Sequence, residues 1–144
     1  MGIEPMYVDT SVVVKLYFKE PDSEECEAVA TGSTLVSSRL LYCEFRSALR
    51  SKVSRGNVSA EVGAEVWQDF MNDIAAHRMQ FVALDDMLVQ DAADLLSELH
   101  LKVPLRTLDA LHLATFLSAD VGPLFTKDAR MLRAASQLGL PLAG

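Results

Sequence analysis

Short apolar runs alternate with longer segments of helical spacing along this chain. Each short run is rich in apolar, β-branched or aromatic residues and is bounded by polar or turn-forming residues, a pattern typical of strands. The longer segments place apolar residues every three to four positions, as amphipathic helices do. We expect strands at Met6–Val8, Thr34–Ser37, Gln80–Leu84 and Pro123–Thr126, with a short fifth at Leu140–Leu142.

Helical segments fill the intervals between the predicted strands. Two of them, at about 38–55 and 59–78, separate the second and third strands, and another begins near Ala129. Gly32, Gly56 and Gly139 stand where a glycine commonly ends a helix. Strands that alternate with helices predict an α/β domain with a mostly parallel sheet of four to five strands. Sites in such sheets lie beyond the carboxyl ends of the strands, so the residues that follow each strand become the candidates.

Length and composition fit one compact domain over residues 1–144. Half of the residues are hydrophobic, which is enough to build a core without crosslinks. No apolar run reaches the roughly 18 residues that cross a membrane, and the first residues do not resemble a signal peptide. We therefore expect a cytoplasmic protein. Its two cysteines, Cys26 and Cys43, form no metal-binding motif, and we expect reduced structural thiols.

The net charge of −7, from 20 acidic against 13 basic residues, argues by itself against a nucleic-acid-binding protein. Two arrangements would reverse that argument. The acidic residues could surround a cation that neutralises them, or the basic residues could gather on one face. Both arrangements can be examined from the positions of the charged residues.

Asp9 and Asp128 each follow a predicted strand. Either residue could simply be a helix N-cap, since Asp, Ser and Thr all cap helices well. For the first helix, Thr10 and Ser11 are available to cap, which would leave Asp9 free to point into a cleft. On spacing alone both interpretations stay open.

Two further acidic positions are less distinctive. Asp85 and Asp86 follow the third strand and open a helix, and we expect them only to cap it and to interact with its dipole. Glu44 lies at the rim of the buried stripe of the 38–55 helix, within two turns of the second strand. There it would project toward the same sheet edge as Asp9, although a solvated surface glutamate is the better supported interpretation on this evidence alone.

Asp109 stands in an otherwise apolar helical segment, Leu108–Leu117. Leu105, Leu113 and Phe116 share its helix face. An ionised carboxylate in such surroundings is costly to desolvate unless a cation pairs with it. Arg106, three residues earlier, could form that pair, and a metal ion is the alternative that we favour.

Four carboxylates that converge on one sheet edge would repel one another strongly without a cation. Mg²⁺ and Mn²⁺ prefer oxygen ligands and commonly keep several waters. The corresponding chemistry is metal-assisted hydrolysis of a phosphodiester. Asp9, Glu44, Asp109 and Asp128 are thus the predicted catalytic and metal-binding residues.

Basic residues form two groups near these positions. One is an arginine stripe on the 38–55 helix and the other lies beside Asp128; a solvated face is the usual meaning of each alone. Arginine also grips phosphate through its planar fork, so these side chains are predicted RNA ligands: Arg39, Arg46, Arg50, Lys127 and Arg130. His112 could reach the site, but we expect a core residue that is hydrogen-bonded to backbone.

Several short motifs resemble those of PIN-domain nucleases. They are Tyr7–Ser11, Glu44 followed by 45–50, Leu105–Ala114, and the Thr-x-Asp motif at Thr126–Asp128, with Ala134, Ala135, Gly139 and Leu140 after it. Each motif is weak alone, but four in the right order over nearly the whole chain make a fairly specific signal. Chains of this size resemble the VapC-type toxins of toxin–antitoxin pairs.

The resemblance implies a PIN-type fold, a three-layer α/β/α domain around a parallel sheet. It implies Mg²⁺- or Mn²⁺-dependent cleavage of RNA (tRNA, rRNA or mRNA) by the four carboxylates, with Ser11 and Thr126 as supporting hydroxyls in the pocket. It also implies a homodimer and a small VapB-type antitoxin partner, which can place a basic side chain in the acidic pocket.

Rival functions remain at this stage. A receiver-like phosphoacceptor domain also places acids, a hydroxyl and a lysine at strand ends, but it needs adjacent acids after the first strand, where Asp9 stands alone. A haloacid-dehalogenase-type phosphatase needs a second Asp two residues after Asp9, and Ser11 stands there. The third rival is a non-catalytic PIN-like domain that only binds RNA.

Overall fold

The computed structural model describes residues 4–99 and 101–144. The strands are β1 (Pro5–Val8), β2 (Thr34–Ser38), β3 (Met79–Val82) and β4 (Leu124–Phe125). The helices are α1 (Thr10–Tyr17), α2 (Ser23–Ala30), α3 (Leu40–Ser54), α4 (Ala60–Ala75), α5 (Asp86–Glu98), α6 (Thr107–Ala119) and α7 (Ala129–Leu138). The four main strand predictions are confirmed, with shifts of one or two residues at their ends. His100 lies outside the described residues.

The strands form one parallel sheet in the order β3-β2-β1-β4. Because every pairing is parallel, all four carboxyl ends lie at one edge. The predicted fifth strand is reduced to a single bridge between Leu142 and Leu124. This order also differs from the 2-1-3-4-5 order of receiver-type domains, which removes the structural basis of that rival.

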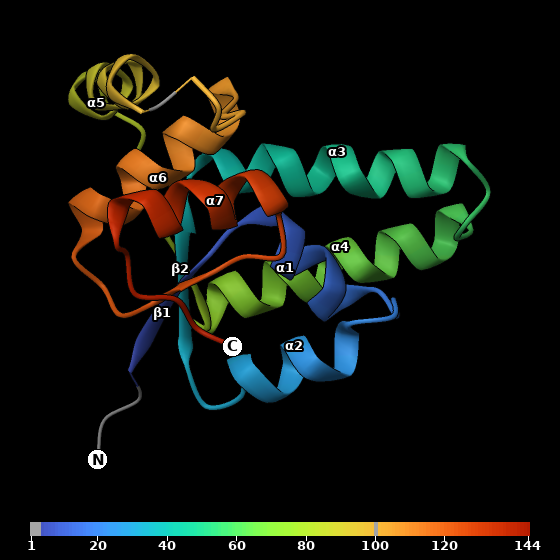
Figure 1. Cartoon of the computed structure of the whole chain (residues 1–144). Coiled ribbons are helices and arrows are strands. Elements are labelled where there is room, and N and C mark those ends of the chain that lie inside the picture. Colours follow the sequence, from blue (N-terminus) through green and yellow to red (C-terminus); the bar gives the residue numbers. More distant parts are fainter. Residues whose placement is uncertain (1–3, 100) are drawn as a thin grey trace.

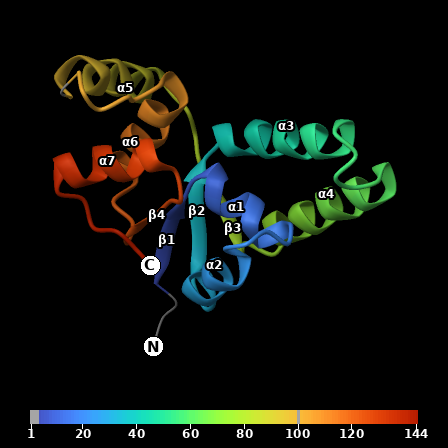
Figure 2. The same cartoon turned by 45° about the vertical axis from the view of Figure 1, so that its right-hand side comes forward.

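Helices cover both faces of the sheet, so the predicted three-layer α/β/α architecture is confirmed (Figures 1 and 2). Residues alternate between the faces along β1. Tyr7 packs into a core with α5, α6 and α7, whereas Met6 and Val8 pack into a second core with α1 to α4. This alternation follows from the two-residue period of a strand.

Helices α3 and α4 form a hairpin that extends away from the sheet (Figures 1 and 2). Gly56 ends α3 with φ of +76°, a conformation that favours glycine, as the sequence predicted. Aromatic rings fill the interior of the hairpin near the sheet, with the Phe45 and Phe70 centroids 4.6 Å apart. Gly63 on α4 allows close approach, because an added Cβ would lie 2.9 Å from Val53 of α3.

The structure also bears on the cysteines and on membrane spanning. Both cysteines are free thiols; Cys26 is buried, as expected of a structural thiol, whereas Cys43 is exposed. Among the helices described, none has the length and apolar character needed to cross a membrane.

Candidate active site

The candidate acidic residues come from the segments that leave one edge of the sheet. Asp9 joins β1 to α1, Asp128 follows β4 and begins α7, and Glu44 lies early in the helix that follows β2. Asp109 comes from the first turn of α6. Three helix N-termini therefore lie beside these carboxylates, and their backbone N–H groups and dipoles favour negative charge.

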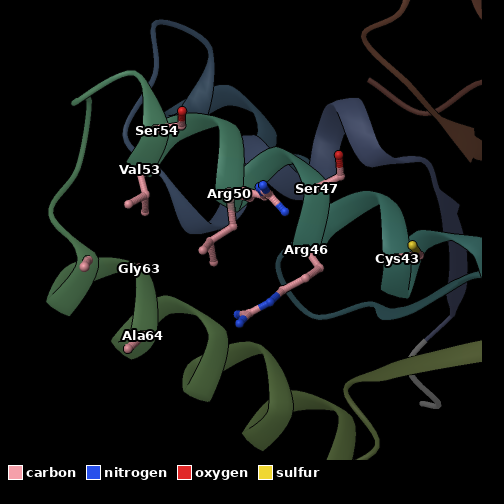
Figure 3. A pocket seen from close by; sticks show the side chains of 10 residues that line it. Cys43, Arg46, Ser47, Arg50, Val53, Ser54, Gly63 and Ala64 are labelled. Carbon is pink, nitrogen blue, oxygen red and sulfur yellow. The ribbon is translucent and has the colours of Figure 1, made fainter.

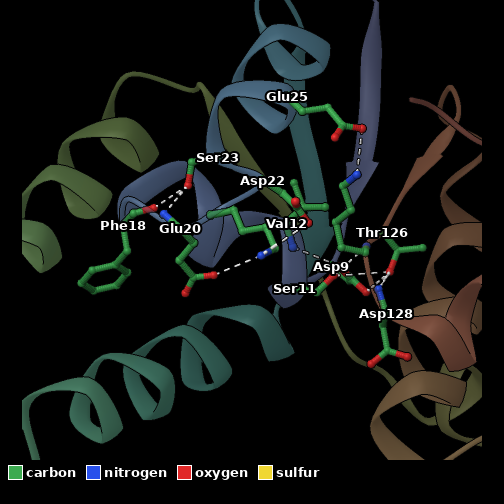
Figure 4. A network of polar contacts seen from close by, with 12 residues as sticks. Asp9, Ser11, Val12, Phe18, Glu20, Asp22, Ser23, Glu25, Thr126 and Asp128 are labelled. Carbon is green, nitrogen blue, oxygen red and sulfur yellow. Dashed lines mark hydrogen bonds and ion pairs between the residues drawn. The ribbon is translucent and has the colours of Figure 1, made fainter. Parts of the chain in front are cut away.

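Asp9 is 4% exposed and is held through both carboxylate oxygens. Ser11 donates to Oδ1 at 2.6 Å, the Val12 backbone N–H donates to the same oxygen at 3.4 Å, and Thr126 donates to Oδ2 at 2.5 Å (Figure 4). Asp9 is itself the N-cap of α1. The idea that Thr10 or Ser11 would cap this helix is wrong, because the helix begins at Thr10.

Burial raises the pKa of Asp9 above its usual range, even though the hydroxyls of Ser11 and Thr126 lower it. The nearby His112 lowers the pKa of Asp9 as well, to a smaller extent. No ion pair joins Asp9 to a lysine or arginine within residues 4–99 and 101–144. The ionised side chain is thus desolvated without a full counter-charge.

Thr126 and Ser11 connect β1 to the segment that follows β4. Thr126 Oγ1 accepts from the Asp128 backbone N–H at 3.0 Å, and Ser11 Oγ accepts from the Lys127 N–H at 2.9 Å. Asp128 caps α7 by accepting from the backbone N–H of Arg130 at 2.8 Å, and one of its oxygens lies 4.0 Å from the Arg130 guanidinium. The capping interpretation of Asp128 therefore holds structurally, while its position also places it beside Asp9's hydroxyl partner.

Asp109 does not form the salt bridge with Arg106 that the sequence offered as an alternative. Its Oδ2 instead accepts from the Arg106 backbone N–H at 3.1 Å, as an acid in the first helical turn does. Burial raises the pKa of Asp109, and the negative charge of Asp128 raises it further. Arg130 and His112 act in the opposite direction. The carboxylate of Asp128 therefore lies close enough to Asp109 to disfavour its ionisation.

Glu44 is anchored by two donors on a single oxygen. Thr10 donates to Oε1 at 2.9 Å and His112 Nε2 lies 2.6 Å from the same atom. His112 is buried, and its other ring nitrogen lies 2.8 Å from the Tyr7 hydroxyl. The expectation that backbone groups would satisfy His112 is wrong, because both partners are side chains from other elements.

The structure links the four predicted acids without packing them against one another. In the described part of the chain, no three acidic, histidine or cysteine side chains lie close enough to form a ready metal-binding group. Like charges repel, so contact between these carboxylates is not expected. Mg²⁺ usually binds through one or two carboxylates and keeps several waters. The oxygen donors, and the raised pKa values of Asp9 and Asp109, fit such an ion chemically.

Two of the predicted RNA ligands line a groove between α3 and α4 (Figure 3). The groove has a volume of about 770 Å³; Arg46 and Arg50 both line it, and Arg46 reaches into the space between the two helices. Arg46 also stacks over Trp67, at 4.6 Å from the ring centroid. Arg46 follows Glu44 by two positions, which is about 200° around a helix. Arg46 therefore points away from Glu44 around α3, and the contact of both arginines with RNA stays a prediction.

The remaining basic candidates are placed differently. Arg39 stacks on Tyr42 and Phe81, at 4.6 and 5.3 Å from the two ring centroids. Lys127 forms an ion pair with Glu25 of α2 at 3.0 Å (Figure 4). Only Arg130, of the five predicted, approaches a candidate carboxylate. It lines a cleft of about 300 Å³ beside Asp128, together with the more exposed Arg133.

Sequence reasoning assigned no site role to Tyr7 or Thr10 and placed His112 in the core. The spacing of His112, three residues after Asp109 on one helix, was the only signal for it. Asp85 and Asp86 behave as expected: Asp85 caps α5 by accepting from the Leu88 N–H at 2.9 Å, and Asp86 is the first residue of that helix.

Comparison with known proteins adds independent information. The sequence matches the family model described as PIN domain over residues 6–137. It is 33% identical over 138 residues to Ribonuclease VapC46 of Mycobacterium tuberculosis, covering 94% of this chain and 93% of that protein.

Three solved structures share the fold. The crystal structure of M. tuberculosis VapC20, described as a sarcin-ricin loop cleaving toxin, has a TM-score of 0.70 at 14% identity and covers 94% of this chain and 95% of its own. VapBC2 from Rickettsia felis, bound to a DNA fragment from its promoter, has a TM-score of 0.64 at 18% identity, with 96% of both chains covered. A toxin–antitoxin complex from Klebsiella pneumoniae has a TM-score of 0.55 at 14% identity, with 85% and 86% covered. At these identities the structural matches concern the fold alone.

Proposed function

The chain belongs to the PIN-domain family, and from this premise we propose that it is a ribonuclease that hydrolyses RNA phosphodiester bonds with Mg²⁺ or Mn²⁺. One observation carries the proposal: Asp9 and Asp109 have pKa values raised by burial and lack a basic ion-pair partner in the described part of the chain. A cation bound there relieves that cost. The ribonuclease name of the 33% identical relative supports RNA as the substrate, and the match over 6–137 supports a single nuclease domain.

The residues divide into holding and positioning roles. Asp9, Glu44, Asp109 and Asp128 would hold the cation directly or through water. A divalent cation held by these residues would supply a water of lowered pKa and positive charge opposite the phosphodiester. Ser11 and Thr126 keep both oxygens of Asp9 oriented through the hydrogen bonds at 2.6 and 2.5 Å.

Arg130 is the proposed ligand of the substrate phosphate. Arg130 lies beside Asp128 and lines the adjacent cleft with Arg133. An arginine fork next to the carboxylates suits contact with a phosphate oxygen. The net charge of −7 disfavours RNA binding when taken alone. A cation would neutralise the acids of the site, and Arg130 adds positive charge beside them.

We propose further that the chain is the toxin of a toxin–antitoxin pair and acts in the cytoplasm as a homodimer. A small antitoxin protein would be its regulatory partner. Three proteins of the same fold support this role: VapC20 is a toxin, the R. felis structure is VapBC2 bound to promoter DNA, and the K. pneumoniae structure is a toxin–antitoxin complex.

The direct test is cleavage of total RNA by purified protein with and without Mg²⁺ or Mn²⁺. We expect cleavage that stops on addition of EDTA and is abolished by Asp9→Asn. Asp85→Asn is the matched control, because Asp85 is also a helix N-cap between a strand and a helix, three residues after the end of β3, and none of its hydrogen bonds in the described part of the chain joins it to the four candidate acids. Cleavage that persists in EDTA would sink the metal mechanism.

The toxin role needs a separate measurement. Induction of the wild-type chain in a bacterial host should arrest growth, and Asp9→Asn should not. Co-expression of a small protein encoded beside this chain should relieve the arrest. Normal growth during high expression of an RNA-cleaving wild-type protein would contradict the toxin role while leaving the ribonuclease intact.

A further inference from the structure

His112 is a buried titratable residue that the proposed hydrolysis does not use directly. It lies on α6, three residues after Asp109, and is 3% exposed. Both of its ring nitrogens are within hydrogen-bond distance of side chains from other elements. Nδ1 lies 2.8 Å from the hydroxyl of Tyr7 on β1, and Nε2 lies 2.6 Å from Oε1 of Glu44 on α3. His112 thus bridges the central strand to a candidate metal ligand.

The carboxylate of Glu44 indicates the direction of these hydrogen bonds. A carboxylate oxygen only accepts, so Nε2–H of His112 donates to Oε1 of Glu44. In a neutral imidazole Nδ1 is then an acceptor, and the Tyr7 hydroxyl donates to it. The Tyr7 oxygen itself accepts from the Ser38 backbone N–H at 3.1 Å. A chain of donors therefore runs from β2 through β1 and α6 to α3.

The two carboxylate oxygens of Glu44 differ in their hydrogen bonds. Oε1 receives His112 and also the Thr10 hydroxyl at 2.9 Å. Oε2 has no hydrogen-bond partner among the residues that the structure describes, and 17% of the Glu44 side chain is exposed. One oxygen is thus fixed by the protein, and the other is available to a ligand.

We propose that Tyr7 and His112 are positioning residues for Glu44: they hold Oε1 so that Oε2 is presented to the divalent cation, an inference that rests on the proposed metal-dependent function. Side chains behind a metal ligand commonly orient it in this way, and their loss typically weakens metal binding by about 10- to 100-fold. A direct role of His112 on RNA is disfavoured, because the ring is buried and both nitrogens are engaged within the protein.

The contacts of His112 suggest three variants. His112→Leu removes both hydrogen bonds. His112→Gln keeps an amide N–H that can replace Nε2–H as the donor to Glu44. Tyr7→Phe keeps the ring and deletes the hydroxyl that directs the proton of His112. Tyr42→Phe is the control, since the Tyr42 hydroxyl contacts only the sulfur of Met71, at 3.6 Å, in the described structure.

The readout is the dissociation constant of Mn²⁺ without RNA, measured by electron paramagnetic resonance, alongside thermal melting and the kcat of RNA cleavage at saturating Mn²⁺. We expect His112→Leu to weaken Mn²⁺ binding about 10-fold or more, Tyr7→Phe to weaken it less, and His112→Gln to restore most of the binding. Tyr42→Phe should match wild type.

A second comparison shows whether the effect passes through Glu44. In a Glu44→Gln background, Tyr7→Phe should cause no further loss of Mn²⁺ binding. Equal losses with His112→Leu and His112→Gln, or lowered melting temperatures with unchanged Mn²⁺ binding, would reduce these residues to structural roles and overturn the inference alone. A wild-type protein that binds no Mn²⁺ and cleaves no RNA would overturn both the inference and the proposed function.

Discussion

Replacing Thr126 by valine tests how the most buried candidate carboxylate is supported. Thr126 is 4% exposed, and its hydroxyl donates to Asp9 Oδ2 at 2.5 Å and accepts from the Asp128 backbone N–H at 3.0 Å. Valine has nearly the same shape but lacks the hydroxyl. Thr126→Val therefore leaves an oxygen of Asp9 and a backbone N–H without these partners.

The expected cost follows from the two hydrogen bonds. A bond to a charged acceptor contributes roughly 1.5–3 kcal/mol and a neutral bond about 1 kcal/mol. Thr126→Val should thus lower the free energy of unfolding by about 3 kcal/mol, which corresponds to a fall in melting temperature of roughly 10 °C. RNA cleavage should fall as well, because Asp9 loses the donor that orients it.

Ser23→Ala is a matched control. Ser23 is also 4% exposed, and its hydroxyl donates to the Phe18 carbonyl at 2.8 Å and accepts from the Glu20 N–H at 2.8 Å (Figure 4). The number of bonds is the same, but neither partner is charged. The expected cost is about 2 kcal/mol. Both variants are compared with wild type by urea unfolding across a range of pH, without metal.

The pH dependence separates the two variants. The Thr126 hydroxyl lowers the pKa of Asp9, so it stabilises the ionised form. That part of its contribution is present when Asp9 is ionised and is lost as the pH falls through the pKa of Asp9, which burial raises above the ordinary aspartate value of about 4. The cost of Thr126→Val should shrink in acid while that of Ser23→Ala stays constant. Equal and pH-independent costs would refute the charged hydrogen bond.

Asp109→Asn should raise the melting temperature of the metal-free protein by a few degrees at about pH 7.5, because burial raises the pKa of Asp109 and its ionisation therefore destabilises the fold above the ordinary carboxyl range. Differential scanning fluorimetry should show that gain vanish near pH 4; a destabilised variant at neutral pH would contradict it. Mg²⁺ should raise the melting temperature of wild type more at about pH 8 than at about pH 5, since carboxylate ligands must be ionised; a shift independent of pH would speak against carboxylate ligands. Gly122→Ala should cost about 2–3 kcal/mol, because its Cβ would lie 2.3 Å from the rigid carbonyl of Pro5, whereas Gly63→Ala meets the movable side chain of Val53 at 2.9 Å and should cost less in urea unfolding.

Much of the fold could be predicted from local patterns. The four main strands, the 3.6-residue spacing of α3 and α4, and the glycines with positive φ after helices all depend on neighbouring residues in the chain. Alternation of strands and helices then predicts a parallel sheet. The prediction of a fifth strand was wrong, because Leu140–Leu142 forms only one bridge, between Leu142 and Leu124. The number of paired residues depends on the partner strand and cannot be read from the segment itself.

The candidate acids could be predicted from the sequence because the parallel sheet itself could be predicted. Parallel strands bring their carboxyl ends to one edge, so acids that follow strands share a region whatever the details of packing. Capping was the competing interpretation, and the structure shows that Asp9 and Asp128 do cap their helices. An N-cap residue that follows a buried strand already lies at the carboxyl edge of the sheet, so the same residue can cap a helix and belong to the candidate site.

Tertiary structure alone decided which side chains meet. His112 bonds to Tyr7 and Glu44 across 105 and 68 residues of sequence, and Lys127 pairs with Glu25 across 102. No local rule connects positions so far apart, because their contact depends on how helices pack on the two faces of the sheet. Sequence by itself determined the elements and the edge where the acids gather. Packing decided that one histidine holds one of those acids, since the direction of a side chain is set by the elements that surround it.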